Sequence, residues 1–475
     1  MLRHDSIPGN KTSFPPNMPL ETELTTAPRR AGPKGSFFLG NLQEFGRDPL
    51  GFLERCVRDY GDFVHLRFLK RPVCLLNNPA DIEYVLTANS RNFRKTLGYR
   101  TPFMRRLFGQ GLLTSEGDLW LRQRRLAQPA FHRDRIATYA TTIVEFTERL
   151  LATWQTGETR ALHRDMLRLT TEVVVQSLFH SDVPPEIENM NNESVVVLEH
   201  FTKQCSVWRL FSSLLPTPGK RRFEQLVRRL DEFIYSVIRE RRASGKDAGD
   251  LLSMLLQTRD EHGQGMNDRQ LRDELTTLIL AGLDTTALAL SWAFYLLSQN
   301  LAAADKLFAE LQTVLAGRAP RFTDLPQLRY TEMIVKETMR LYPSAWLIGR
   351  EAIHDCEIGG HRIAAGTSLV MSQWLKHRDR RYFESPDKFI PERWTDEFVK
   401  TLPKYAYFPF GGGPRLCIGH SFAMMEAMLV LATVGQKFRV TSTPGYAVVP
   451  WPSITLQPKE GIHLRVERRQ APSSN

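Results

Sequence analysis

Residues 408–420 read FPFGGGPRLCIGH, and this stretch decides how the rest of the chain is interpreted. Three glycines and a proline predict a loop whose backbone can approach a flat ligand closely. The loop ends at Cys417, and we expect a helix to begin directly after it, over residues 418–437. A thiol in this position favours its thiolate form, because the helix dipole and free backbone N–H groups stabilise the negative charge. Cys417 is therefore a candidate metal ligand.

Two other interpretations of this loop are open. A glycine-rich loop before a helix can cradle phosphate, but no Gly-Lys-Ser/Thr follows here. Cys417 could also be a buried core thiol, the commoner fate of a lone cysteine. Against both, the loop has the spacing F-x-x-G-x-R-x-C-x-G, which resembles the haem-binding loop of cytochrome P450 and is formed by Phe410, Gly413, Arg415, Cys417 and Gly419. The resemblance implies haem b (iron protoporphyrin IX) as the cofactor, Cys417 as its iron ligand and the other four as cofactor-binding residues.

Further motifs extend the resemblance from about residue 31 to the C-terminus. Glu337 and Arg340 lie three residues apart on one face of a predicted helix and can form an ion pair. This spacing alone is weak, because Glu44 and Arg47 repeat it in a turn-like region. Downstream, Arg393 in the segment PERW resembles the third member of the family's Glu-Arg-Arg cluster. The resemblance implies that Glu337, Arg340 and Arg393 are structural residues that brace the core beneath the haem.

Haem carries two propionates that need cations or hydrogen-bond donors. Trp120 and Arg124 stand four residues apart, which places an indole N–H and a guanidinium on one helix face. They resemble the family's W-x-x-x-R motif, and Arg350 and Arg415 resemble its other propionate-facing arginines. The resemblance implies that all four are cofactor-binding residues.

The long apolar stretch Leu275–Leu297 contains a single charge, Asp284. A transmembrane helix tolerates an acid poorly at its middle, so we expect a helix buried through the centre of a large soluble domain. Asp284 and Thr285 belong to the segment AGLDTT, which resembles the family's acid–threonine motif. An N-cap-like Asp-Thr pair at a helix break is the alternative. The resemblance implies that Thr285 and Asp284 are catalytic, the threonine in oxygen activation and the acid in proton delivery.

Composition places the chain among globular proteins, because 42% of its 475 residues are hydrophobic and 24% are charged. Its five cysteines form no Cys-x-x-Cys pair, which suggests a reducing compartment and offers no zinc site. The net charge of +11 comes without a basic tract interleaved with aromatics, so nucleic acid is not an expected partner. Residues 1–30 are polar and broken by prolines, and we expect a flexible arm, no membrane anchor and a cytoplasmic protein.

The periodicity of apolar residues predicts a mainly helical protein with small β-sheets, and one domain over residues 31–475. The predicted helices are 48–60, 115–128 with Ser115 as N-cap, 133–154, 164–180, 220–243, 268–299, 301–315, 327–342 and 418–437. The predicted strands are Phe63–Phe68 and Val73–Asn77, which form a hairpin, then Glu357–Ile363, Ser368–Met371, Ile454–Leu456 and Ile462–Val466. The resemblance implies the cytochrome P450 fold, a single large domain with a long buried central helix.

The resemblance implies a monooxygenase that inserts one oxygen atom from O2, its co-substrate, into a lipophilic small molecule by hydroxylation or epoxidation. NAD(P)H would serve only indirectly, because no fused reductase is expected in this soluble, bacterial-type monomer. Electrons would come from an acidic ferredoxin or flavodoxin-type partner with its reductase, which would dock near Arg122, Arg125, Arg133 and Lys404. The rivals are a peroxide-using or isomerising haem-thiolate enzyme and a haem-based gas sensor, neither of which requires the acid–threonine pair.

The substrate is expected to be a fatty acid, a terpenoid or a retinoid-like compound. By their position in the family, residues 101–113, about 196–216 and 344–348 would line the cavity together with Ala281. Phe103, Ala281, Trp346 and Leu347 are the candidate substrate contacts, although large apolar residues are ordinarily core residues.

Overall fold

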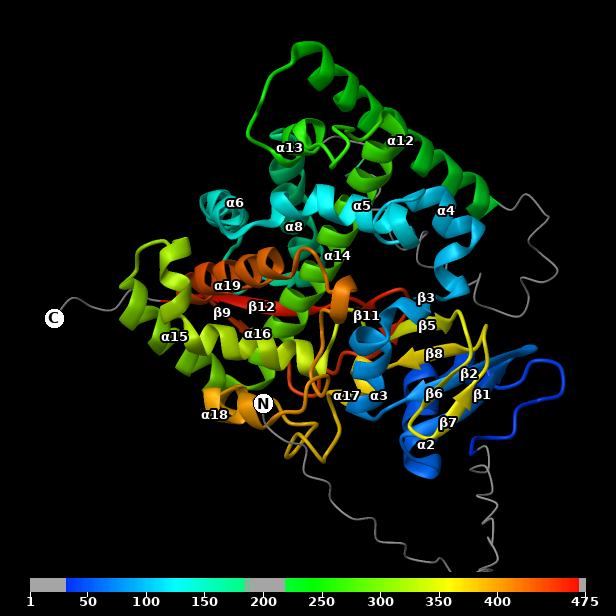
Figure 1. Ribbon diagram of the computed structural model, residues 1–475. Helices are drawn as coiled ribbons and strands as arrows, with labels where there is room; N and C mark the ends of the chain where they lie inside the picture. The colour runs from blue at the N-terminus through cyan, green and yellow to red at the C-terminus, as the bar shows by residue number, and fades with distance from the viewer. Residues whose placement is uncertain (1–30, 184–186, 188–217, 470–475) are drawn as a thin grey trace, which may run out of the picture.

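The computed structural model describes residues 31–183, 187 and 218–469 of the chain. The expected N-terminal arm, residues 1–30, and the expected substrate-contact region 196–216 lie outside these described residues. Helices make up most of the described fold, and the largest sheet lies beside them at one end of the molecule (Figure 1). The predicted fold class, mainly α with small β-sheets, is confirmed.

The elements have the following bounds in the described residues. The α-helices are α1 (Leu42–Arg47), α2 (Pro49–Tyr60), α3 (Pro79–Glu83), α4 (Pro102–Phe108), α5 (Gly117–Ala127), α6 (Arg133–Thr138), α7 (Ala140–Ala152), α8 (Leu162–Phe179), α12 (Pro218–Ser244), α13 (Leu251–Gln257), α14 (Asp268–Gln299), α15 (Leu301–Leu315), α16 (Arg329–Leu341), α17 (Gln373–Lys376), α18 (Asp396–Thr401) and α19 (His420–Lys437). The strands are β1 (Phe63–Phe68), β2 (Arg71–Leu76), β3 (Phe93–Lys95), β4 (Thr159–Ala161), β5 (Ile348–Ala352), β6 (Cys356–Ile358), β7 (His361–Ile363), β8 (Ser368–Met371), β9 (Phe438–Thr441), β10 (Pro450–Pro452), β11 (Leu456–Pro458) and β12 (His463–Arg468).

Helix α14 runs through the centre of the molecule (Figure 1). It has 32 residues and starts at a capping box formed by Asn267 and Gln270. Helices α8, α12, α16 and α19 pack against it. Among the helices of the described residues, only α14 has the length and hydropathy of a membrane span, and 61% of its apolar stretch is buried inside the protein. The predicted long central helix is therefore confirmed as a core element.

Gly282 determines how closely α14 and α8 approach each other. A Cβ at this position would lie 2.8 Å from Cγ2 of Val174 on α8, which is closer than side chains tolerate. Helix α14 is continuous through Asp284 and Thr285, so the alternative of a helix break at this motif is wrong. The glycine serves close helix packing.

The largest sheet has the strand order β1-β2-β8-β5-β3. Strands β1 and β2 form the predicted hairpin, and Leu69 turns the chain between them with a φ of +57°. Strand β8 pairs with β2 in parallel, whereas β5 and β3 extend the sheet in antiparallel pairs. Strands β3 and β5 were not predicted, and their register places Lys95 directly opposite Arg350. The predicted strand Glu357–Ile363 is a hairpin of β6 and β7, because two glycines with positive φ turn the chain inside it.

The structure divides one predicted helix into two and changes the N-terminus of another. The segment 133–154 forms two helices, α6 and α7, because the chain turns at Tyr139 between them. Ser115 is not an N-cap: α5 begins at Gly117 after Glu116, and the buried Ser115 hydroxyl has no hydrogen-bond partner among the described residues. The Ser115 N–H instead closes a turn with the Gly111 carbonyl at 2.9 Å.

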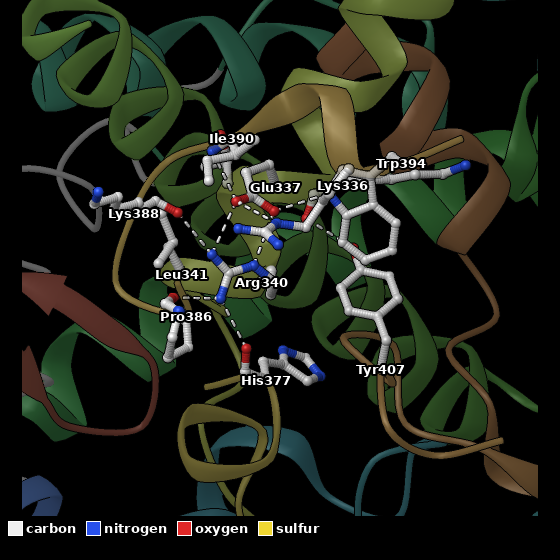
Figure 2. Close-up of polar contacts among 12 residues, drawn as sticks. Lys336, Glu337, Arg340, Leu341, His377, Pro386, Lys388, Ile390, Trp394 and Tyr407 are labelled. Atoms are coloured by element: carbon white, nitrogen blue, oxygen red, sulfur yellow. Dashed lines mark hydrogen bonds and ion pairs between the residues drawn. The ribbon is translucent and has the colours of Figure 1, made fainter. Parts of the chain in front are cut away.

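The carboxylate of Glu337 on α16 is fully buried and accepts hydrogen bonds from four residues (Figure 2). Arg340 donates from Nε and Nη2 at 2.8 Å each, and Arg393 donates from Nε at 3.0 Å. The Trp394 indole donates at 2.9 Å and the Ile390 backbone N–H at 3.0 Å. The structure thus brings together the three residues of the predicted Glu-Arg-Arg cluster.

This cluster is connected to the cysteine loop through His377. Nη1 of Arg340 donates to the His377 carbonyl at 2.9 Å, and Nε2 of the same histidine accepts from the Phe408 N–H at 2.9 Å. Burial and the Arg340 charge hold the pKa of His377 well below its usual range, so the ring is neutral and can accept. The Tyr407 hydroxyl also donates to the Lys336 carbonyl at 3.0 Å (Figure 2). The start of the cysteine loop is thereby fixed to α16.

Candidate active site

A cavity of about 430 Å³ lies between α5, α8, α14, α16 and α19 and the loop before α19. This volume falls within the range of small-molecule sites. Much of its wall is apolar, with Leu112, Leu113, Val174, Leu178, Leu278 and Ala281 among the lining residues. Cys417 and Thr285 both line the same cavity. The structure therefore brings the predicted iron ligand and the predicted oxygen-activation residue into one enclosed space.

Cys417 is an exposed cysteine that lines the cavity. Its backbone N–H donates to the Phe410 carbonyl at 3.0 Å, which closes the loop. Burial raises the pKa of the thiol, whereas the Gly419 N–H and the Arg124 charge act in the opposite direction. Helix α19 begins at His420 with Gly419 as its N-cap, two residues later than predicted. The thiol thus sits at the helix N-terminus, as the sequence indicated, with a backbone donor on its sulfur.

The glycines of the loop have two different roles. A Cβ on Gly413, whose φ is +64°, would lie 1.8 Å from the Leu86 carbonyl oxygen, and one on Gly412 would lie 2.2 Å from the Tyr405 ring. Because these two glycines lack a Cβ, the loop can pack closely against Leu86 and Tyr405. By contrast, a Cβ on Gly411 meets no atom within 4 Å, and one on Gly419 comes no closer than 3.8 Å to another residue. Both of these line the cavity, and they leave open space for a bound group.

Basic residues gather at the cavity near the acid Glu116. Its carboxylate accepts from the Lys95 N–H at 2.8 Å and forms an ion pair with Arg415. The Arg415 guanidinium lies over the Trp120 ring, 4.3 Å from its centroid, and its buried Nη1 has no partner among the described residues. Arg350 lines the same region, and burial lowers the pKa of its guanidinium.

Lys95 is also part of this basic group, although no motif in the sequence indicated it. It is buried, and its Nζ donates to the Leu112 carbonyl at 2.7 Å. Burial and the charges of Arg415 and Arg350 lower its pKa well below the usual range. Only the register of β3 against β5 brings Lys95 to the cavity, and no local sequence signal indicated that pairing.

Together these features fit haem. A planar dianion needs a wall without side chains and an end with more positive than negative charge. The wall without side chains is provided by Gly411 and Gly419. The positive charge is provided by Lys95, Arg350 and Arg415. Arg415 Nη1 has an unmet need for an acceptor, which a propionate oxygen can satisfy. Arg124 lies nearer the cysteine, since its Nη1 donates to the Leu416 carbonyl at 2.9 Å.

Thr285 and Asp284 point in different directions from α14. The Thr285 hydroxyl donates to the Ala281 carbonyl at 2.7 Å and lines the cavity. The Asp284 carboxylate is not part of the cavity wall in the described residues. It accepts from the Thr455 hydroxyl at 2.7 Å and from Gln457 Nε2 at 3.0 Å and 3.1 Å. These partners lie 171 and 173 residues away, so the sequence could not indicate them.

Glu426 is a further polar group that sequence reasoning missed. It lies on α19, is fully buried, and neither of its oxygens has a partner at normal hydrogen-bond geometry in the described residues. Burial raises its pKa to about 8, and the nearby Thr286 hydroxyl acts in the opposite direction. Thr286 itself lines the cavity. The only sequence signal was one acid in an otherwise apolar helix.

Of the four predicted substrate contacts, only Ala281 lines the cavity in the described residues. Phe103 stacks on Phe223 of α12 with 4.8 Å between ring centroids. The buried Trp346 donates its indole N–H to the Ser453 carbonyl at 3.0 Å, and Leu347 packs in the same apolar cluster as Trp346. Phe103, Trp346 and Leu347 do not line this cavity, whereas Leu112, Ala345 and Ile348 from the same predicted segments do.

The basic residues predicted to dock a redox partner are partly engaged within the protein. Arg122 Nε donates to Asp260 at 2.6 Å, and Lys404 Nζ donates to Glu83 at 2.7 Å. Arg133 lies over the Phe322 ring, 5.8 Å from its centroid. Arg125 is exposed and has no ion pair among the described residues. Docking of a redox partner near these residues stays a prediction, and Arg122 would have to act there while paired with Asp260.

Comparisons with known proteins agree with this site. The family model described as "Cytochrome P450" matches residues 31–465. Cyclooctatin synthase of Streptomyces melanosporofaciens is 38% identical over 427 residues, which cover 89% of this chain and 92% of the relative. Cyclooctat-9-en-7-ol 5-monooxygenase of the same organism is 35% identical over 92% of this chain and 93% of its own length. Pentalenene oxygenase of Streptomyces avermitilis is 31% identical over 91% and 95%, respectively.

The buried acid Glu426 leads to a prediction about stability. Its folded pKa of about 8 exceeds the ordinary value of 4.5 for a glutamate, so the folded protein keeps a proton that the unfolded chain releases. Stability from this group is fully present below about pH 4.5 and is lost as the pH rises to about 8. The variant Glu426→Gln cannot ionise, so we expect its stability advantage over the parent to grow by about 1.4 kcal/mol per pH unit within this window. Urea unfolding midpoints between pH 5 and pH 9 measure the difference.

Glu351→Gln is the matched control for a buried acid. Burial favours the neutral form of Glu351, but hydrogen bonds from Arg94 and Arg100 outweigh it and lower the pKa. The stability that Glu351 contributes is therefore present above its unfolded pKa and is lost only as the pH falls. The loss of unfolding free energy in Glu351→Gln, relative to the parent, should stay constant between pH 5 and pH 9. A constant difference for Glu426→Gln as well would contradict a raised pKa.

Proposed function

Because the chain belongs to the cytochrome P450 family, it is a haem-dependent monooxygenase, and we propose that its substrate is a terpenoid. Members of this family use haem and O2, with electrons from NAD(P)H that arrive through partner proteins. Haem, when bound, supplies the activation of O2 and the transfer of one oxygen atom to the substrate. The homologues named for cyclooctatin and pentalenene act on terpenoids, which supports the proposed substrate class.

The proposal assigns the cofactor site to this chain's own residues. Cys417 would be the iron ligand, because it lines the cavity with the Gly419 N–H on its sulfur. Arg124, Arg350, Arg415 and the Trp120 indole would bind the propionates, with Lys95 as a further donor in the cavity wall. Residues 31–475 would form the haem-thiolate domain. The unpaired Nη1 of Arg415 is the single observation that carries this assignment furthest.

Thr285 would hold a proton at its Oγ1 in the cavity, where the hydroxyl can donate once it leaves the Ala281 carbonyl. Asp284 would resupply that proton. Its carboxylate is held by Thr455 and Gln457, so it must turn from these partners toward the cavity to do so. Rotation of the Asp284 side chain between these two positions would let the carboxyl group take up a proton away from the substrate and release it to the cavity.

An apolar substrate suits the wall that remains for it. Thr277 and Ser177 line the cavity, but their hydroxyls donate to carbonyls of their own helices at 2.7 Å each. Both hydroxyls are therefore already engaged, whereas the side-chain amide of Gln373 lines the cavity without a hydrogen-bond partner among the described residues. A fatty acid would need a partner for its carboxylate away from the propionate end. A retinoid-like substrate stays a second candidate, since it presents the same apolar surface.

We also infer a separate acidic ferredoxin or flavodoxin-type partner and a cytoplasmic location. The exposed Arg125 supports an acidic partner, since attraction between opposite charges steers association. Arg122 cannot contribute while it is paired with Asp260. The described helix with the length of a membrane span is a core element, which fits a cytoplasmic protein.

A ligand panel tests the proposed substrate. Cyclic diterpene and sesquiterpene hydrocarbons, fatty acids and retinoids would be titrated into the haem-loaded protein. We expect a Soret shift, caused by displacement of iron-bound water, with the cyclic terpenes at the lowest concentrations. Tighter binding of fatty acids than of any terpene would contradict the proposal.

Cys417→Ser tests the iron ligand. We expect the variant to lose the red-shifted Soret band that a thiolate ligand gives to the ferrous carbonyl complex, because an alcohol is a weaker donor to iron. Cys356→Ser, a partly exposed cysteine on β6, is the control and should keep the band. A normal band in Cys417→Ser would mean that another residue binds the iron.

Thr285→Ala tests oxygen activation. We expect the variant to fold and bind haem but to release peroxide in place of product, with coupling between NAD(P)H use and product formation reduced about tenfold. Thr277→Ala is a close control, because Thr277 lies two turns earlier on α14, lines the same cavity and makes the same backbone hydrogen bond. Equal coupling in the two variants would remove Thr285 from the mechanism.

A further inference from the structure

Two aromatic side chains are displayed to solvent on the turn Ser36–Gly40, which we call the aromatic turn. Phe37 is 85% exposed and Phe38 is 80% exposed. The other exposed large apolar side chains of the described residues are between 36% and 59% exposed, so these two stand apart. Among the aromatic groups of the described residues, the two rings contact only each other, edge to face, with centroids 5.0 Å apart. Single exposed apolar residues are ordinary, but an adjacent pair of such exposed rings indicates a binding surface.

The aromatic turn is held rigidly against the tip of the β1–β2 hairpin. Ser36 and Gly40 exchange two backbone hydrogen bonds of 2.9 Å, and the Leu69 N–H donates to the Leu39 carbonyl at 3.0 Å. Arg67 Nη2 donates to the Ser36 carbonyl at 2.6 Å. Gly40 is required here, since its φ is +61° and a Cβ would lie 1.9 Å from the Arg67 carbonyl oxygen. The rings are therefore presented on a fixed support, which lowers the entropy cost of binding.

Positive charge surrounds the aromatic turn. Lys34, Lys70 and Arg71 are exposed and form no ion pair among the described residues. Neither the segment 31–41 nor the hairpin tip 68–72 contains an acid. Many other exposed arginines of this chain do have an acidic partner, as Arg55 has Asp48. The patch thus combines apolar rings with unpaired cations.

We propose that the aromatic turn, with Lys34, Lys70 and Arg71, docks on the surface of an anionic lipid bilayer. Aromatic rings partition into the headgroup region, and each nearby Lys or Arg adds electrostatic attraction to anionic lipid. The shape favours this partner over a protein, because the segment before α1 projects as a narrow loop from the edge of the sheet (Figure 1). A projecting tip can enter a headgroup layer, whereas stable protein interfaces need a broad surface.

Such docking is peripheral and reversible, so it is compatible with a cytoplasmic protein. The proposed docking goes beyond the proposed reaction and does not depend on that reaction, since lipid binding is measured without substrate or turnover. Its benefit is that a lipophilic compound dissolved in the bilayer would meet the enzyme at the membrane surface. A wrong substrate assignment would leave the lipid measurement unaffected.

Vesicle co-sedimentation of the full-length, haem-loaded protein tests the proposal. We expect binding to vesicles of phosphatidylglycerol and phosphatidylcholine, weak binding to pure phosphatidylcholine, and a loss of binding at high salt. The variant Phe37→Ser with Phe38→Ser should reduce the partition coefficient about tenfold or more. Lys70→Glu with Arg71→Glu should reduce it by a similar factor.

Two control variants match these changes elsewhere on the surface. Leu301→Ser with Val399→Ser removes two exposed apolar side chains from α15 and α18, which lie at the other side of the molecule from β1 and β2 (Figure 1). Lys246→Glu with Lys459→Glu makes the same change in net charge at exposed positions. Both controls should bind like the parent. Absence of parent binding to anionic vesicles, or equal losses in the test and control variants, would overturn the proposal.

Discussion

The buried carboxylate of Glu337 is the interaction on which the catalytic end of the molecule depends. One acid accepts hydrogen bonds from Arg340, Arg393, Trp394 and Ile390, and so ties α16 to a stretch of chain more than fifty residues downstream. Arg340 also holds the His377 carbonyl, and the neutral imidazole of His377 holds the first residue of the cysteine loop. Breaking a buried pair of this kind costs about 3–5 kcal/mol, because a charge is left without a partner. The thiol is positioned through this chain of contacts.

Local patterns in the sequence predicted the helices and the cysteine loop well, because each rests on residues close together in the chain. The spacing around Cys417 and the apolar run of α14 are examples. The contacts that could not be predicted join residues far apart in the chain. Lys95 reaches the cavity only through the register of β3 against β5, and Asp284 turns toward Thr455 and Gln457 through a packing that no local pattern encodes. Trp346, a predicted substrate contact, does not line the cavity and donates to the Ser453 carbonyl, a partner more than a hundred residues away.

The basic end of the cavity connects cofactor binding to stability. Lys95, Arg350 and Arg415 lie near Glu116, and burial disfavours the charged form of each. A buried cation without enough negative charge nearby is costly, and two carboxylates bound among these residues would remove much of that cost. A ligand that binds only the folded state raises its apparent stability by mass action. Haem is thus expected to act as a structural component of this domain as well as its reactive group.

The contact between Gly282 and Val174 has a consequence for how this chain can diverge. Any side chain larger than hydrogen at position 282 would collide with the branched, stiff side chain of Val174 across the α8–α14 contact. A substitution there is tolerated only if position 174 shrinks at the same time or the two helices separate, and separation would reshape the cavity that Val174 and Gly282 both line. Across descendants of this sequence, the two positions should therefore covary, although they are 108 positions apart in the chain.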